Sequence, residues 1–146
     1  MLARDLMSSS VITVQTQATV GDAAKLMLEN NVSCLPVVDV QGHLEGLLTH
    51  TDFGLHPRFR PLADNIFSLL GTSASPKHIE EISKTVRGKL VKDVMHHPVT
   101  TVKEDTPISD VMQLMLNQGI HRLPVMKDGH MVGIITRHDF LKLIAY

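Results

Sequence analysis

A four-residue pattern that could bind a sugar or a phosphate occurs twice, as Thr49 followed by Asp52 and as Thr136 followed by Asp139. Each copy follows an apolar run that predicts a strand, and each is expected to open a helix. A helix start offers unpaired backbone N–H groups and the positive end of the helix dipole, which suit an anion. A carboxylate there can also accept hydrogen bonds from both hydroxyls of a sugar diol. The pattern therefore indicates a candidate site for a phosphate or a sugar.

The same residues also have a purely structural interpretation. A Thr at the N-cap and an acidic residue at the N3 position form a capping box, in which the two side chains satisfy backbone N–H groups of the helix start. Capping alone would explain both copies, and the two roles are compatible. Both interpretations of Asp52 and Asp139 therefore stay open at this level.

Basic side chains accompany the second copy of the pattern and are missing from the first. Arg122, Arg137 and His138 are candidate phosphate partners, since a guanidinium group can bind phosphate oxygens through two parallel hydrogen bonds. The first copy has Ser33-Cys34 and His50-Thr51 at the corresponding places. We therefore expect the first site to be the weaker one.

Both copies of the pattern belong to an internal repeat, in which residues 3–53 correspond to residues 91–140. Asp5-Leu6-Met7 corresponds to Asp93-Val94-Met95, and Leu35-Pro36-Val37 corresponds to Leu123-Pro124-Val125. Two copies are too few for a solenoid, so we expect them to pack on each other about a pseudo-two-fold axis. The predicted organisation is a first repeat at 1–56, a helical insert at 57–90 and a second repeat at 91–146.

Each repeat predicts the element order β-α-β-β-α. A short β-branched run at 11–14 or 99–102 precedes an apolar stripe of helical spacing at 20–28 or 108–116. Thr106 is the expected N-cap of the second stripe, with Pro107 at the first helical position and Gly119 at the end. Two further apolar runs flank a turn at Gln41-Gly42 or Asp128-Gly129, which predicts a hairpin. The fold class is therefore α/β, with helices on one face of a small sheet.

Two helices are predicted in the segment between the repeats. One covers 61–70 and stops at Gly71, and the other begins at Ser75-Pro76, carries an apolar stripe and ends at Gly88. The closing segment 140–146 is apolar nearly all round, and Leu26 and Leu114 lie beside the main helical stripes. Apolar surface of this kind usually marks a partner, so we expect a homodimer, unless the helices between the repeats cover it.

In these features the chain resembles the tandem cystathionine-β-synthase (CBS) domain pair, or Bateman module. The likeness rests on the order of four segments in the second repeat, 93–95, 98–102, 119–125 and 133–139, and on a looser set in the first. It covers nearly the whole chain except residues 54–90. Because no segment is left over for a catalytic domain, we expect a stand-alone regulatory module rather than an enzyme.

The resemblance implies that adenosine nucleotides (AMP, ADP or ATP) bind in two clefts between the repeats and that the module modulates a partner protein in trans. It assigns Asp139 to the ribose and Thr136 to the phosphate, with adenine beside the backbone of 100–102. The residues expected in the second-repeat site are Val99, Thr100, Thr101, Ile120, His121, Arg122, Pro124, Thr136, Arg137, His138 and Asp139. Those expected in the weaker first-repeat site are Ile12, Thr13, Val32, Ser33, Cys34, Pro36, Thr49, His50 and Asp52.

Composition argues against several other classes of protein. Lys plus Arg number 14 and Asp plus Glu 15, and this net charge of −1 does not suit a binder of nucleic acid or of a membrane surface. Hydrophobic residues make up 43% of the chain, which is typical of a globular domain, but no apolar run is long enough to cross a membrane. Cys34 is the single cysteine, so the expected location is a reducing cytoplasm.

Two rival functions remain open from the sequence. The first is a structural dimerisation or docking module whose nucleotide pockets are vestigial. The second is a metal-dependent hydrolase, which the nine His residues and the pair His96-His97 suggest. No H-E-x-x-H motif, paired Cys or His/carboxylate cluster accompanies them, so we expect no metal, no catalytic residue and no catalytic cofactor.

Overall fold

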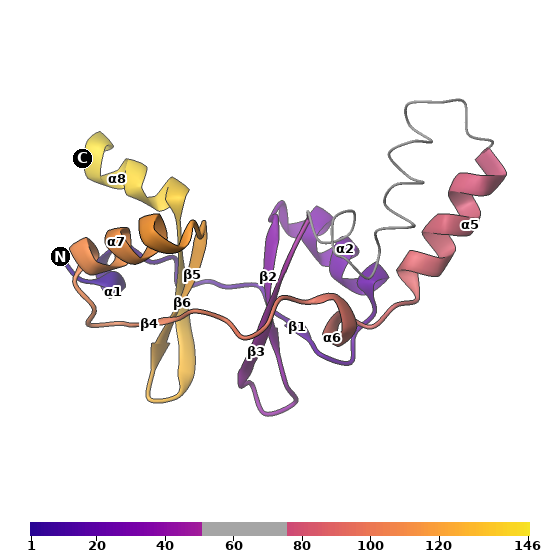
Figure 1. Ribbon diagram of the computed structural model, residues 1–146, viewed down its shortest axis with the longest axis horizontal. Helices are drawn as coiled ribbons and strands as arrows, with labels where there is room; N and C mark the ends of the chain where they lie inside the picture. The colour runs from indigo at the N-terminus through magenta and orange to yellow at the C-terminus, as the bar shows by residue number, and fades with distance from the viewer. Residues whose placement is uncertain (51–75) are drawn as a thin grey trace. The chain divides into compact units, whose positions relative to one another are not determined.

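The computed structural model describes residues 1–50 and 76–146 (Figure 1). The chain forms two compact units, and neither is one continuous stretch. The first-repeat unit consists of Ile12–Gln41 and Glu45–Pro98. The second-repeat unit consists of Met1–Val11, Gly42–Leu44 and Val99–Tyr146.

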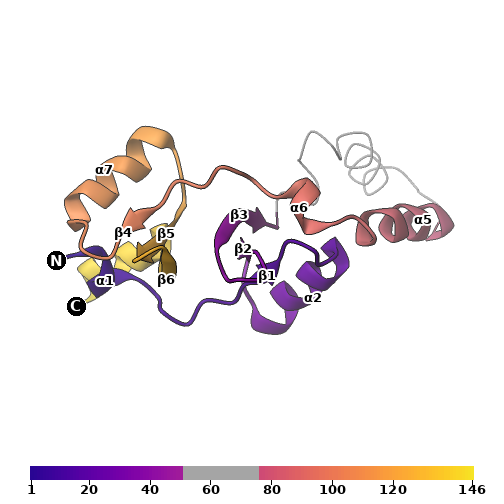
Figure 2. The ribbon, with the colours of Figure 1, turned by 90° about the horizontal axis from the view of Figure 1, so that it is seen from below.

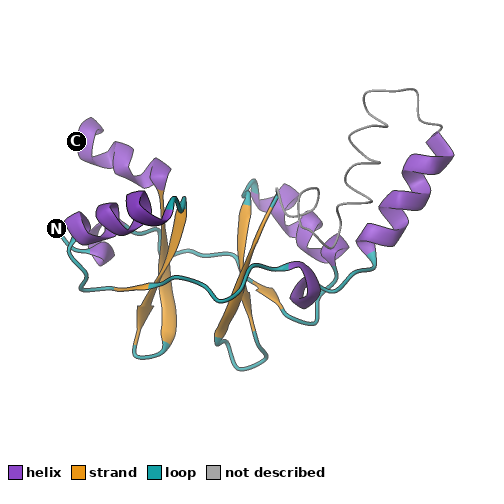
Figure 3. Cartoon of the chain, viewed as in Figure 1, coloured by secondary structure: helices purple, strands orange, loops and turns teal. Residues whose placement is uncertain are grey.

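A three-stranded sheet with helices forms the second-repeat unit (Figure 3). Its elements are α1 (Ala3–Leu6), β4 (Val102–Lys103), α7 (Ile108–Gln118), β5 (Arg122–Lys127), β6 (His130–Thr136), the 3₁₀ helix η2 (Arg137–Leu141) and α8 (Lys142–Ala145). The strand order is β4-β5-β6, with β4 parallel and β6 antiparallel to β5. The parallel strands are joined through α7, because parallel neighbours need a crossover connection.

The same order is found in the first-repeat unit (Figures 1 and 2). Its elements are β1 (Val14–Gln15), α2 (Val20–Asn30), β2 (Cys34–Val38), β3 (Leu44–Thr49), α5 (Pro76–Arg87) and α6 (Val91–Val94). The strand order is β1-β2-β3, with β1 parallel to β2. The predicted α/β class and the β-α-β-β order are thus confirmed in both units, and α5 confirms the second helix of the insert. The predicted helices after Thr49 and over 61–70 lie outside the described residues.

Turn chemistry fixes the β5–β6 hairpin where the sequence predicts it. Asp128 has φ 50° and Gly129 has φ 80°, both in the left-handed region. A two-residue turn with positive φ at both positions matches the twist of paired strands and favours Asp-Gly. This turn sets the register in which Arg122, the first residue of β5, lies opposite Thr136, the last residue of β6.

Helix α7 ends where the sequence predicts, and α2 ends in the same way at a residue that was not predicted. Gly119, with φ 63°, is the C-cap of α7, and Asn31, with φ 51°, has the same role at the end of α2. At the start of α2 the hydroxyl of Thr19 accepts a hydrogen bond from the backbone N–H of Asp22 at 3.1 Å. This contact satisfies one of the unpaired donors of the first turn.

The prediction that Thr106 caps α7 is wrong. Pro107 occupies the N-cap position, and it makes no side-chain capping hydrogen bond. The hydroxyl of Thr106 instead accepts a hydrogen bond from the backbone N–H of Lys103 at 3.1 Å. The Thr106 side chain therefore stabilises the turn between β4 and α7 and does not cap the start of α7.

Each core includes a short helix that sequence analysis did not predict. Helix α1 contributes to the second-repeat core, and α6 contributes to the first-repeat core. The buried residues are Ala3, Leu6, Val102, Ile108, Val111, Met115, Leu123, Val125 and Ile135 in the second-repeat unit, and Val14, Val20, Ala23, Met27, Leu35, Val37, Leu48, Val91 and Val94 in the first. The opening segment of each sequence repeat thus packs in the unit named for the other repeat.

The buried stripes of α2 and α7 are narrower than the sequence predicts. Leu28 is 84% exposed and Leu116, at the equivalent position of the second repeat, is 74% exposed. Met112 also faces solvent, at 42% exposed. These side chains belong to the predicted apolar stripes, but they lie at the edge that turns away from the sheet.

Glycine allows a close approach between two backbones in each unit. The segment after α1 forms an isolated β-bridge between Ser8 and Ile134, and the segment after α6 forms one between His96 and Leu47. A Cβ placed on Gly133 would lie 2.9 Å from the carbonyl oxygen of Ser8. A Cβ on Gly46 would lie 2.8 Å from that of His96, so a larger residue at either position requires the backbone to shift.

Candidate ligand site

The carboxylate of Asp139 lies where β6 ends and η2 begins. Its Oδ2 accepts hydrogen bonds from the backbone N–H of Thr136 at 2.7 Å and from the Thr136 hydroxyl at 3.1 Å. Its Oδ1 accepts from Nζ of Lys142 at 2.9 Å and from the hydroxyl of Ser8 at 3.5 Å. The bond from the Thr136 N–H is the contact that a capping box requires, so the capping interpretation is confirmed for the second repeat.

Asp139 is buried, at 5% exposed. Burial raises the pKa of its carboxyl, but the hydrogen bonds from Lys142 and Thr136 and the positive charge of Lys142 outweigh that effect. The pKa of Asp139 therefore lies below its ordinary value. The group is a carboxylate at neutral pH and can act only as a hydrogen-bond acceptor.

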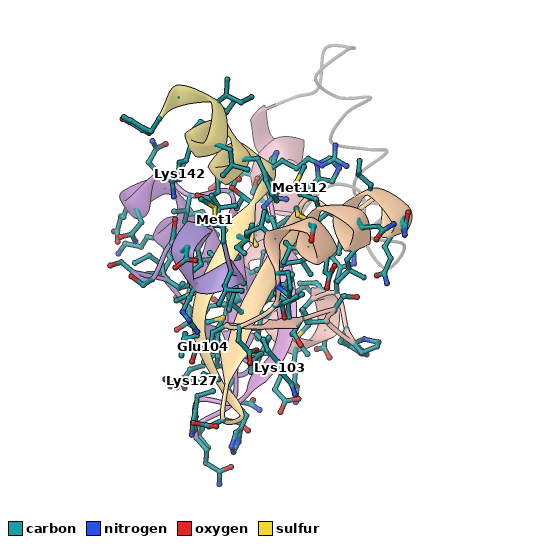
Figure 4. All side chains as sticks on the ribbon, turned by 90° about the vertical axis from the view of Figure 1, so that its left-hand side faces the viewer. Met1, Lys103, Glu104, Met112, Lys127 and Lys142 are labelled. Carbon is teal, nitrogen blue, oxygen red and sulfur yellow. The ribbon has the colours of Figure 1, made fainter. Side chains whose placement is uncertain are left out.

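Lys142 connects this carboxylate to the N-terminal segment. Besides Asp139, its Nζ donates to the backbone carbonyl of Leu6 at 3.2 Å, and half of its side chain remains exposed (Figure 4). Ser8 is held in place by backbone hydrogen bonds with Ile134 of 2.9 and 3.0 Å. The network thus joins residues at the two ends of the chain.

Predicted basic residues gather at the same end of the sheet. Because Arg122 pairs with Thr136 in the β5–β6 ladder, its side chain starts beside the Asp139 network. The backbone N–H of Arg137 donates to the carbonyl of His121 at 3.1 Å, which closes this end of the hairpin. Arg137 and His138 are exposed, whereas Arg122 is half-buried. Cationic groups and one buried carboxylate therefore share one end of β5 and β6.

Arg137 also lines a small apolar cavity of about 250 Å³ with Met112, Met115, Leu116 and Phe140. Ligand pockets usually measure roughly 300–1,000 Å³. The cavity is therefore small for a whole nucleotide, although Arg137 lies beside its apolar surface.

The remaining predicted residues of the second repeat differ in how much surface they expose. Pro124 is buried in β5, and Ile120 packs against the second-repeat core while staying partly exposed. Val99 and Thr100 are half-buried and Thr101 is exposed, just before β4 begins. Strand β4 pairs only with Val125 and Met126, so Pro124, which has no N–H to donate, lies just outside the paired stretch.

The first-repeat unit reproduces this backbone frame. The N–H of His50 donates to the carbonyl of Ser33 at 3.0 Å, as Arg137 does to His121 in the second repeat. Pro36 is buried, as Pro124 is, and Asp52 lies outside the described residues. Half-buried side chains of the predicted first site are Ile12, Thr13, Val32, Cys34 and Thr49, and Ser33 and His50 are exposed.

Sequence reasoning missed Ser8 and Lys142, two of the donors to Asp139. Lys142 follows Asp139 by three positions, and the i,i+3 spacing of opposite charges at a helix start is a signal that could have found it. Ser8 is separated from Asp139 by 131 positions, so no local pattern links them.

Two further cavities lie away from the predicted residues. One, of about 590 Å³, lies between α2 and α5 and is lined mainly by apolar groups, with Lys25, Glu29 and Arg87 at its polar part. The other, of about 440 Å³, adjoins the ion pair of 3.1 Å between Lys127 and Glu104 (Figure 4).

Residues 1–50 and 76–146 contain neither a cluster of metal ligands nor a membrane-spanning helix. In these ranges no three His, Cys, Asp or Glu side chains are grouped so that they could hold a metal ion. Nor does any helix there combine the length and the apolar character that crossing a bilayer requires.

Family comparison is decisive for the fold. The model of the CBS domain family matches residues 3–53 and 91–146, which is more than half of the chain. The chain belongs to the CBS domain family. The two matches fall within the two repeats that the sequence predicts, so the family resemblance is confirmed.

Solved CBS domains share this architecture. The CBS domain of a CBS domain-containing membrane protein from Sphaerobacter thermophilus is 38% identical, with a TM-score of 0.79, over 98% of this chain and 87% of that one. The CBS domain pair of protein MJ0100, solved with 5′-methylthioadenosine and S-adenosyl-L-methionine, is 27% identical with a TM-score of 0.70 over 99% and 96% of the chains. CBSX2, solved with AMP, is 26% identical with a TM-score of 0.72 over 99% and 96%.

Relatives of this CBS pair include both short and long proteins. A CBS domain-containing protein of Dictyostelium discoideum is 30% identical over 144 residues, which cover 98% of this chain and 90% of that protein. Inosine-5′-monophosphate dehydrogenase of Methanocaldococcus jannaschii is 33% identical over 145 residues. This chain spans 99% of its own length but 24% of that enzyme.

Proposed function

We propose that this CBS pair is a regulatory module that binds an adenosine-containing nucleotide and thereby modulates a partner protein. The observation that carries the proposal is the ionised, buried carboxylate of Asp139 at the end of the β5–β6 hairpin that also bears Arg122, Arg137 and His138. Related CBS pairs were solved with AMP and with 5′-methylthioadenosine and S-adenosyl-L-methionine. These ligands share adenosine and differ at the 5′ carbon, which supports adenosine as the recognised part.

Each part of the ligand has a proposed partner in the second repeat. Asp139 accepts hydrogen bonds from the ribose hydroxyls, and Thr136 donates to a phosphate oxygen. Arg122 and Arg137 add charge for the phosphate of AMP, ADP or ATP, and His138 offers a further hydrogen-bonding group. The apolar side chains of Val99 and Ile120 flank the adenine, whose edge meets the backbone just before β4.

The first repeat is the weaker site in this proposal. It keeps the backbone frame of Ser33 and His50 but has no arginine at the positions of Arg122 and Arg137. A ligand there would lack the bidentate phosphate contacts, so we expect the second-repeat site to bind it with the higher affinity.

Isothermal titration calorimetry with AMP, ADP and ATP tests the proposal. At least one of them should bind with a micromolar Kd, which corresponds to about −8 kcal/mol. The melting temperature should then rise with ligand concentration, because the ligand binds the folded state. S-adenosylmethionine and NADH serve as comparison ligands. Absence of both heat and thermal shift with all five would contradict the proposal.

A second candidate function, a structural dimerisation or docking module, is favoured by exposed apolar side chains. Leu28 and Leu116 protrude from equivalent positions of α2 and α7, and Ile144 of α8 is 85% exposed. Such side chains usually mark a partner surface. This module would form a homodimer and bind none of the nucleotides, so sedimentation and calorimetry on the same sample separate the two functions. A homodimer, a non-enzymatic role and a cytoplasmic location remain predictions under both.

A further inference from the structure

The acceptor capacity of Asp139 is fully used inside the protein. A carboxylate offers about four lone-pair positions. Four donors occupy them, with two from Thr136 on Oδ2 and one each from Lys142 and Ser8 on Oδ1. A ribose diol brings two more donors, so at least part of this network must give way before both hydroxyls can bind.

The donors differ in how easily they can leave. The backbone N–H of Thr136, at 2.7 Å, is fixed by the hairpin and by the start of η2. Ser8 makes the longest contact, 3.5 Å, but its backbone is held by Ile134. Lys142 has a flexible side chain that is 49% exposed, so its ammonium can move into water without a shift of the backbone. Of the two donors to Oδ1, Lys142 is therefore the one that a ligand displaces first.

We propose that Lys142 is a specificity-determining residue, because its ammonium and a ribose diol compete for the carboxylate of Asp139. The inference rests on the proposed function. The same ammonium donates to the Leu6 carbonyl at the end of α1. Displacement therefore also breaks this hydrogen bond, so ligand binding weakens the contact between α8 and α1.

Substitution of Lys142 separates competition from a merely structural role. Lys142→Met removes the competing ammonium and should raise the affinity for adenosine about tenfold, the effect of about one charge-assisted hydrogen bond. The gain for 2′-deoxyadenosine, which lacks one hydroxyl of the diol, should be much smaller. Lys142→Arg keeps the positive charge and should bind adenosine with the affinity of the unsubstituted protein. Lys127→Met is the matched control, because it removes another ion-paired lysine of the same unit and should leave affinity unchanged.

A labelling measurement on the unsubstituted protein gives a second readout, which holds even where Lys142→Met fails to fold. Adenosine carries no phosphate that could hold the released ammonium. Its binding should therefore raise the rate at which an acetylating reagent modifies Lys142, relative to Lys127. An unchanged rate with adenosine bound overturns the competition.

The outcomes distinguish the inference from the proposed function. Binding by the unsubstituted protein with equal affinity in a folded Lys142→Met overturns the inference alone. Binding that appears or strengthens in Lys142→Met supports it. Absence of binding in both proteins, with AMP and ATP as well as adenosine, overturns the proposed function and the inference together.

Discussion

Gly133 of β6 leaves the space that the backbone of Ser8 occupies, since a Cβ on Gly133 would lie 2.9 Å from the Ser8 carbonyl oxygen. The side chain of Met7 lies over the same position. Ser8 and Ile134 exchange two backbone hydrogen bonds at this place, so the approach is a paired contact between main chains. The segment after α1 can therefore pack against β6 because Gly133 has no side chain.

Gly133→Ala should lower the free energy of unfolding by about 1–3 kcal/mol, because the added methyl group forces the paired backbones apart. Urea denaturation measures the change. Gly88→Ala is the matched control, since the nearest atom to a Cβ there is 3.8 Å away. Equal stability of the two variants would show that the contact tolerates a side chain.

Stability should also fall in acid through Asp139. Burial raises the pKa of its carboxyl, but Lys142 and Thr136 lower it below the value of the unfolded chain. The unfolded state then binds more protons between the two values, so this part of the stability is present above about pH 4 and is lost as the pH falls through the folded-state pKa. Asp139→Asn should remove that acid dependence and cost about 1.5–3 kcal/mol at pH 7. Urea denaturation between pH 7 and pH 3 measures the free energy of unfolding of both proteins. An identical dependence on pH would rule out a contribution of Asp139 to the loss of stability in acid.

Local signals in the sequence predict much of the fold for identifiable reasons. The apolar stripe that begins at Ile108, the left-handed Gly119 and the Asp128-Gly129 turn each act over a few neighbouring residues. Helices α1 and α6 could not be predicted in this way, because four residues are too few to show a helical periodicity. Their apolar side chains, such as Ala3 and Val91, are buried by segments that are distant in the sequence.

In the candidate site, too, local contacts can be predicted from the sequence and long-range contacts cannot. Thr136 and Asp139 were paired correctly because a capping box is local. Ser8 reaches the same carboxylate only because tertiary folding places it there. The exposure of Leu28 was also not predicted, because the width of a buried stripe depends on what packs against it.

Ligand binding is expected to depend more on Asp139 than on Asp52. Asp139→Ala should weaken the binding of the adenosine nucleotide by about 1.5–3 kcal/mol, the cost of a lost charge-assisted hydrogen bond. Asp52→Ala should have a smaller effect, because the first repeat lacks arginine partners. Calorimetry on both variants measures the difference. Equal losses, or no loss from Asp139→Ala, would contradict the asymmetry.

The predicted homodimer can be tested at α8. Ile144 is 85% exposed in the chain, whereas Leu26 and Leu114, also expected at the interface, are half-buried against the cores. Ile144→Asp should convert a dimer to the 16.1 kDa monomer, because an unpaired carboxylate in an interface costs several kcal/mol. Sedimentation velocity at micromolar concentration measures this. Val40→Asp, in an exposed hairpin turn, is the matched control and should stay dimeric. A monomeric unsubstituted chain would falsify the dimer.

The placement of α1 in the second-repeat core limits the order in which the two cores can form during synthesis. Ala3 and Leu6 leave the ribosome long before the strands of the core that buries them, such as β6, have been made. The Ser8–Asp139 contact closes a loop of 131 positions, so it can form only after Asp139 has been made. The first-repeat core, by contrast, has all its residues once Val94 has been made. The first-repeat core can therefore assemble before the strands that bury α1 have been made, although α1 precedes that core in the sequence.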